Sequence, residues 1–186
     1  RPGGVRGGGA LTPALAPVAA AAQAAADAAL GPLPDATLLP PADGRAQTER
    51  ANAWWNRDLP EMAAAEDVTL PPDAGLGTAA IPARRLVPAG ARPGLLVYVH
   101  GGGFAFCSPA THERCARVLA IESGLTVIPP AYRPPPDPPS PAGLPDIVAA
   151  VRAAPAFAAA GPVAVAGDSA GANLALAAVL HEIGAG

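Results

Sequence analysis

The stretch Pro162-Val-Ala-Val-Ala-Gly-Asp-Ser-Ala-Gly171 decides the fold class of this chain. Its first half is a short apolar run of the kind that forms a buried strand, and the alanine- and leucine-rich residues 172–183 that follow predict a helix. A serine between two glycines at a strand-to-helix junction is the context in which Gly-x-Ser-x-Gly forms a nucleophile elbow. Gly167 and Gly171 leave room for such a turn, which makes Ser169 the candidate nucleophile.

A second glycine motif lies earlier in the chain. The continuous apolar run Leu95-Leu-Val-Tyr-Val99 predicts a strand buried on both faces, and it passes directly into His100-Gly-Gly-Gly-Phe104. Three consecutive glycines after a strand form a loop whose N–H groups can face an oxyanion without obstruction from side chains. The two motifs therefore predict a nucleophile and an oxyanion-binding loop in one fold.

Between and before these motifs, strand-like and helix-like runs alternate. Residues 111–123 and 144–159 have helical spacing, whereas Leu125-Thr-Val-Ile128 is typical of a buried strand. Strand, helix, strand, helix, strand indicates an α/β fold with a mainly parallel sheet and helices on both faces. Residues 67–70 and 81–87 predict a strand hairpin ahead of it.

Two domains are expected. Residues 1–60 form a disordered start and N-terminal cap helices, since residues 1–13 are rich in Gly and Pro and helical segments are predicted over 13–29 and 45–56. Residues 61–186 form the α/β core, which is incomplete. The basic lead before the alanine-rich stretch resembles a secretory signal only faintly, so we interpret it as a frayed terminus before a covering helix and expect a cytoplasmic protein.

Composition excludes several classes of partner. With a net charge of −3 and scattered arginines, the chain has no basic patch of the kind that binds nucleic acid. No apolar run is long enough to span a membrane. Cys107 and Cys115 lack the Cys-x-x-Cys spacing of a metal site, so no metal and no cofactor are expected. A small molecule remains the natural partner.

Together the two motifs resemble those of the hormone-sensitive-lipase family of bacterial carboxylesterases, within the α/β-hydrolase superfamily; the likeness runs from about residue 45 to the end. It implies that Ser169 attacks an ester carbonyl and that the N–H groups of Gly102, Gly103 and Ala170 form the oxyanion hole. His100, with Gly101, would order the loop rather than act as base. Asp168, between Gly167 and the serine, would order its turn.

The segment Tyr132-Arg-Pro-Pro-Pro-Asp-Pro-Pro-Ser-Pro-Ala142 resembles the family's Asp-Tyr-Arg-Leu-Ala-Pro-Glu-x-Pro-Phe-Pro-Ala signature. It departs from that signature at four positions, where Ala131, Pro134, Asp137 and Ser140 replace the acid, leucine, glutamate and phenylalanine. The N-terminal helices match the family's caps over the active site.

The histidine and acid of a catalytic triad are expected after the nucleophile, and this chain offers no suitable pair. His181 is twelve positions beyond Ser169 on the same predicted helix, about 18 Å away, and cannot be the base. His112 is expected at the surface or half-buried. We therefore expect little or no turnover from the 186 residues alone. We also expect an exposed sheet edge that favours homo-oligomers or aggregation.

Three functions remain open. The first is a carboxylic ester hydrolase that acts on short to medium acyl esters through Ser169. The second is a non-catalytic homologue of the same fold that binds a small molecule. The third is a fragment with no independent role. The downstream coding sequence, read for an acid and then a histidine, would discriminate most directly among them.

Overall fold

The computed structural model describes residues 16–136 and 139–185. Contacts divide the chain into two compact units, residues 1–33 and 34–186. The described part of the first unit holds one helix, α1 (Pro17–Leu30), which ends at Gly31 with φ 66°. The predicted disorder of residues 1–13 lies outside the described residues. None of the helices in the described ranges is long and apolar enough to cross a membrane.

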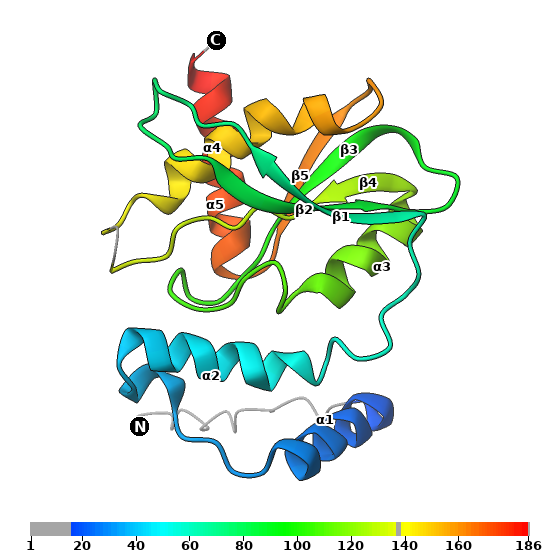
Figure 1. The fold of residues 1–186 in the computed structure, drawn as a ribbon, viewed down its shortest axis with the longest axis vertical. Coiled ribbons are helices and arrows are strands. Elements are labelled where there is room, and N and C mark those ends of the chain that lie inside the picture. Colours follow the sequence, from blue (N-terminus) through cyan, green and yellow to red (C-terminus); the bar gives the residue numbers. More distant parts are fainter. Residues whose placement is uncertain (1–15, 137–138, 186) are drawn as a thin grey trace, which may run out of the picture. The chain divides into compact units, whose positions relative to one another are not determined.

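The second unit is built on a five-stranded sheet (Figure 1). Its strands are β1 (Ala64–Leu70), β2 (Ile81–Val87), β3 (Arg92–Val99), β4 (Leu125–Ile128) and β5 (Val163–Gly167), in the spatial order β1-β2-β4-β3-β5. β3 runs parallel to both β4 and β5, while β2 pairs antiparallel with β1 and with β4. The predicted α/β fold and the predicted hairpin are confirmed, and the parallel part of this mixed sheet carries both glycine motifs.

Helices cover both faces of this sheet. On one face α3 (Glu113–Ser123) packs Ala116 and Ala120 against the sheet, where Tyr98 belongs to the same buried cluster. On the other face α4 (Gly143–Ala153) and α5 (Ala170–Ala185) pack against a larger cluster that includes Val97 and Val99. Successive residues of β3 thus point to opposite faces, and both faces are apolar because both are covered.

Three further elements belong to the unit, and proline accounts for two of the boundaries described next. Helix α2 (Pro41–Ala53) begins four residues before the predicted start, since a proline in the first turn lacks only an N–H that would be unpaired there. The helix predicted over 144–159 ends at Ala153 and continues as the 3₁₀ helix η2 (Ala154–Phe157), because Pro155 cannot donate the next helical hydrogen bond. The 3₁₀ helix η1 (Ala36–Leu38) precedes α2.

Helix α2 belongs to the same compact unit as the sheet. The predicted domain boundary between residues 60 and 61 stays a prediction.

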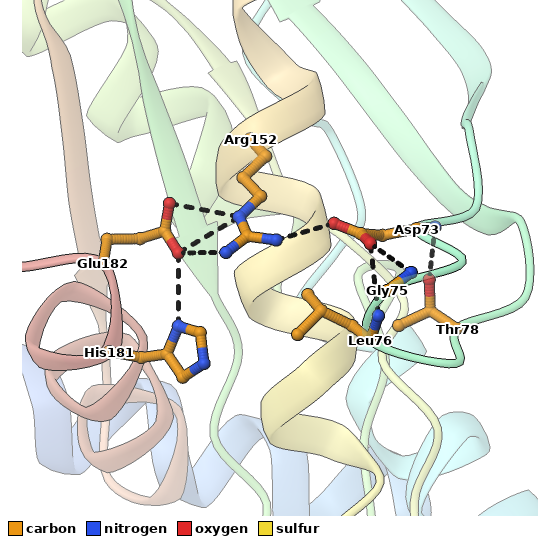
Figure 2. A network of polar contacts seen from close by, with 7 residues as sticks. All are labelled: Asp73, Gly75, Leu76, Thr78, Arg152, His181 and Glu182. Atoms are coloured by element: carbon orange, nitrogen blue, oxygen red, sulfur yellow. Dashed lines mark hydrogen bonds and ion pairs between the residues drawn. The ribbon is translucent and has the colours of Figure 1, made fainter. Parts of the chain in front are cut away.

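An arginine clamp joins α4, α5 and the β1–β2 loop (Figure 2). The guanidinium of Arg152 contacts Glu182 of α5 at 2.9 Å and Asp73 of the loop at 2.8 Å. Asp73 in turn accepts the N–H groups of Gly75 and Leu76, which closes the loop into a tight turn. All three charged groups are at least partly exposed, so the clamp contributes modestly to stability.

Candidate active site

The ends of β3 and β5 bring the two glycine motifs together. Val99 pairs with Gly167 in the parallel ladder, so the loops after both strands leave the same edge of the sheet. A Cβ at Gly171 would lie 2.1 Å from the Val99 carbonyl oxygen and 2.5 Å from the carbonyl oxygen of His100. Only glycine permits this approach of the backbones, which explains why the serine turn needs glycine at that position.

Ser169 occupies the tip of the second turn. Its backbone has φ 50°, a left-handed conformation that is strained for a residue other than glycine, and the residue is exposed. Helix α5 begins immediately after it, and the N–H groups of Gly171 and Ala172 donate to the Asp168 carbonyl oxygen at 2.8 and 3.2 Å. The turn therefore presents the hydroxyl beside a helix N-terminus, where negative charge is stabilised.

The amides proposed for the oxyanion hole are unpaired. Gly102 and Gly103 have φ of 121° and 59°, and the Gly102 carbonyl oxygen accepts the N–H groups of Ala105 and Phe106 in a tight turn. Among the described residues, no protein acceptor is found for the N–H groups of Gly102, Gly103 or Ala170. These donors are available to an oxygen that arrives with a ligand.

Asp168 connects the two loops through its carboxylate. Its Oδ1 accepts the Gly101 N–H at 2.9 Å and the Tyr98 hydroxyl at 2.8 Å, while the His112 ring nitrogen Nε2 lies 3.5 Å from Oδ2. A Cβ at Gly101 would come within 2.3 Å of that same Oδ2. Burial, with help from neighbouring Cys115 and Asp168, raises the pKa of Tyr98, so its hydroxyl remains a donor.

His100 is a buried loop-ordering residue in this geometry. Its ring stacks on Tyr132 with centroids 4.4 Å apart, and its Nδ1 lies 2.8 Å from the Gly101 carbonyl oxygen. Burial lowers the pKa of His100 to about 4, so the ring is neutral near pH 7 and Nδ1–H donates to that carbonyl. The Tyr132 hydroxyl donates to the carbonyl oxygen of His100 at 3.1 Å.

A pocket of about 250 Å³ adjoins the glycine loop. Its walls come from Phe104 of that loop, from the proline-rich segment and from α4 and α5. Most of the lining is apolar, with Tyr132, Pro135, Pro141, Leu144, Leu174 and Ala177 among its residues. A space of this size and character suits a short apolar chain.

The proline-rich segment is anchored at its start. The buried Asp146 accepts the backbone N–H of Arg133 at 2.9 Å and pairs with its guanidinium at 2.7 Å. This ion pair holds the segment that resembles the family signature, although Asp137, one of its departures, lies outside the described residues. The start of this segment is thereby fixed to α4.

No hydrogen bond links a histidine to the candidate nucleophile in the described part of the chain. The Ser169 hydroxyl makes no hydrogen bond to a histidine there, and His181 instead lies toward the far end of α5, 3.2 Å from Glu182 (Figure 2). His112 is half-buried beside Asp168. The predicted position of His181, too distant to serve as base, agrees with this arrangement.

Two residues near the candidate site were not predicted from the sequence. Tyr98 was assigned only to a buried strand, although a hydroxyl inside an apolar strand is a sign that a polar partner is near. His112 was expected at the surface or half-buried, without a partner. Both lie on the α3 side of the sheet, and nothing local in the sequence shows that this side reaches the serine turn.

Comparison with known proteins identifies the fold family. A family model described as the α/β-hydrolase fold matches residues 96–185. An acetyl esterase of Salmonella paratyphi B is 34% identical over 150 residues, which are 75% of this chain and 45% of that protein. The chain thus spans less than half of this relative.

Solved structures of esterases are also similar to this chain. An ester hydrolase from the metagenome of Lake Arreo superposes with a TM-score of 0.76 at 32% identity, covering 92% of this chain and 56% of that one. An esterase of the bacterial hormone-sensitive lipase family superposes with a TM-score of 0.72 at 27% identity, covering 92% and 54%. The chain has the α/β-hydrolase fold and is similar to the esterases of the bacterial hormone-sensitive lipase family.

Proposed function

We propose that the protein is a carboxylic ester hydrolase in which Ser169 is the nucleophile and the N–H groups of Gly102, Gly103 and Ala170 bind the oxyanion. The observation that carries this proposal is the meeting of the two glycine loops at one sheet edge, joined by the hydrogen bond from Gly101 to Asp168. The proposal is further supported by two observations: the described residues offer no protein acceptor for these amides, and Ser169 is exposed with a strained backbone.

The proposed chemistry is acyl transfer in two steps. The Ser169 oxygen bonds to the ester carbonyl carbon while a base takes the hydroxyl proton, and the three amides stabilise the charge that forms on the carbonyl oxygen. The bond from the carbonyl carbon to the alkoxy oxygen then breaks, and the alcohol leaves with that proton. Water repeats the sequence on the acyl-serine and releases the carboxylic acid.

We infer that the base and its acid partner are not among these 186 residues. We propose that they belong to a part of the protein outside this sequence, and that the chain alone carries only the nucleophile and the oxyanion hole. An oxyanion hole without a triad retains a residual acceleration of about 10³–10⁴-fold over water, so slow acylation of Ser169 is expected. The apolar pocket favours short to medium acyl chains.

Single-turnover acylation tests this function. The chain is mixed with p-nitrophenyl butyrate, nitrophenolate release is followed, and the adduct is located by peptide mass spectrometry. We expect about one equivalent of release, an acyl group on Ser169, and no adduct in Ser169→Ala. Added imidazole should stand in for the missing base and accelerate the wild-type chain more than the variant.

Two results would contradict the proposal. Equal release by the wild-type chain and Ser169→Ala would remove Ser169 as nucleophile. Rapid multiple turnover without imidazole would show that a base is present among these residues.

A second candidate function is small-molecule binding without turnover. It is favoured by one observation, namely that no histidine in the described ranges makes a hydrogen bond to Ser169 although a pocket lies beside the glycine loop. A fluorophosphonate probe separates the two functions, because an activated serine is labelled and a receptor-type serine is labelled poorly. Imidazole-dependent labelling would favour the hydrolase, whereas ligand binding with no labelling under any condition would favour the receptor.

A further inference from the structure

Helix α2 touches the loop that follows the three glycines. One guanidinium nitrogen of Arg45, Nη1, lies 2.9 Å from the Pro135 carbonyl oxygen and 3.5 Å from the Ala105 carbonyl oxygen. One helical turn later Glu49 accepts the Ser108 hydroxyl at 3.1 Å. Both side chains project from the same face of the helix because they are four residues apart.

The loop that Arg45 contacts has an unusual backbone. Phe104 and Cys107, on either side of Ala105, have φ of 66° and 69° although neither is a glycine. Such conformations persist only where the surroundings hold them, and they cluster at functional sites. At Gly44 the α2 backbone also approaches the Phe106 ring, which a Cβ would meet at 3.1 Å.

The two carbonyls that Arg45 contacts belong to two segments that each contribute residues to the pocket. Ala105 follows Phe104, which lines the pocket from the glycine loop, and Pro135 lines it from the proline-rich segment. Arg45 has no carboxylate partner in the part of the chain that the structure describes, so its donors serve these carbonyls. A single half-buried side chain therefore bridges both walls.

We propose that Arg45 is a positioning residue: by holding the Ala105 and Pro135 carbonyls it fixes both the width of the acyl pocket and the orientation of the Gly102 and Gly103 amides. This inference rests on the proposed function, because it gives those amides their role. Arg45 touches no reacting atom and acts through the loop. Lysine keeps the positive charge and has three donors on one nitrogen, but its side chain is shorter than the reach of Nη1, so it should replace Arg45 only in part.

Hydrogen exchange of the 186-residue chain provides the first test. In Arg45→Met the amides of Ala105 and Phe106, which donate to the Gly102 carbonyl oxygen, should exchange about ten-fold faster than in the wild type, while those of α4 and α5 stay unchanged. Arg45→Lys should give an intermediate rate. The matched control is Arg152→Met, which breaks the remote clamp and should leave the loop unaffected.

Ligand binding provides the second test, with a readout that general destabilisation would not move. Affinity for methyl hexanoate and methyl acetate is measured by NMR titration in a Ser169→Ala background, so that no acylation interferes. Arg45→Met should weaken methyl hexanoate binding about five-fold relative to methyl acetate, whereas Arg152→Met should leave the ratio unchanged. Recovery of at least part of that ratio in Arg45→Lys would support a positioning role.

Unchanged exchange at Ala105 and Phe106, faster exchange throughout the sheet, or an unchanged binding ratio would each overturn the inference. Neither measurement requires Ser169 to react. Failure of the proposed hydrolase function would instead appear as absent acylation of Ser169, so the two failures are distinguishable.

Discussion

The backbone N–H of Gly101 donates a 2.9 Å hydrogen bond to the carboxylate of Asp168, a residue 67 positions further along the chain. This contact joins the glycine loop after β3 to the serine turn after β5. Since the Tyr98 hydroxyl shares the same carboxylate oxygen, the bond is part of a small network rather than an isolated contact. We expect the relative placement of the proposed nucleophile and the proposed oxyanion donors to depend on it.

Removing the carboxylate should destabilise the fold. Asp168→Ala leaves the Gly101 N–H and the buried Tyr98 hydroxyl without their acceptor, and we expect a loss of about 1–3 kcal/mol in the free energy of unfolding. Tyr98→Phe should cost about 1 kcal/mol, and the double variant less than the sum of the two. Urea denaturation of all four proteins measures this coupling.

A matched carboxylate serves as control for this cycle. Asp67→Ala removes an exposed carboxylate that pairs with Arg84 and does not contact Tyr98. It should combine additively with Tyr98→Phe. Additive behaviour of Asp168→Ala and Tyr98→Phe would contradict the network.

Glycine substitutions at the junction of the two loops should be far more damaging than elsewhere. Gly171→Ala would place a Cβ 2.1 Å from the Val99 carbonyl oxygen, so β3 and α5 must separate, and we expect a loss of more than about 2 kcal/mol or failure to fold. Gly184→Ala, on the same helix with open space around it, should be neutral or stabilising by up to about 1 kcal/mol. Thermal unfolding measures the stability of both variants, and equal losses of stability would contradict the close approach of the backbones at Gly171.

Much of this fold could be predicted from local patterns. The strands β3, β4 and β5 were found because strands buried on both faces appear as continuous apolar runs, and the serine turn because its glycines are obligatory. The antiparallel junction of β2 with β4 was not predicted, since the order of strands in a sheet is decided by packing between distant segments. The local sequence therefore does not show that β2 lies beside β4.

The contacts of Arg45 illustrate a second limit. Its acceptors are the backbone carbonyls of Ala105 and Pro135, and every residue carries a carbonyl. No side-chain identity could therefore mark them as partners. The candidate site was predictable where chemistry depends on residue type, as at Ser169, and unpredictable where it depends on backbone groups brought together by the fold.

His100 should make stability depend on pH in the acidic range. Its pKa is lowered to about 4 in the folded chain by burial, whereas an unfolded histidine titrates near 6.5. As pH falls from about 6.5 to 4, the unfolded state binds a proton and the folded state does not. The free energy of unfolding is therefore highest above pH 6.5 and falls through this window, by about 3 kcal/mol in all.

Replacing the ring isolates this contribution. His100→Asn should lower the free energy of unfolding by the same amount at every pH, because stacking on Tyr132 is lost. Between pH 7 and 4.5, however, the free energy of unfolding of this variant should fall less than that of the wild type. His181→Asn, at an exposed position, is the control and should keep the wild-type pH profile. Urea denaturation at several pH values provides the data, and parallel profiles for wild type and His100→Asn would refute a buried neutral histidine.

The outer face of α5 should drive self-association of the chain. Leu176, Leu180 and Ile183 are 62%, 59% and 71% exposed and lie on one stripe of the helix. Next to it, β5 pairs only with β3 among the described strands, which leaves a free sheet edge. An apolar stripe beside an unpaired edge favours contact with another molecule.

Leu180→Glu should therefore shift the chain toward the monomer in analytical ultracentrifugation, whereas Ile121→Glu, a 45% exposed position on α3 across the sheet, should not. Association that survives Leu180→Glu but is abolished by Ile121→Glu would assign the contact to the opposite face.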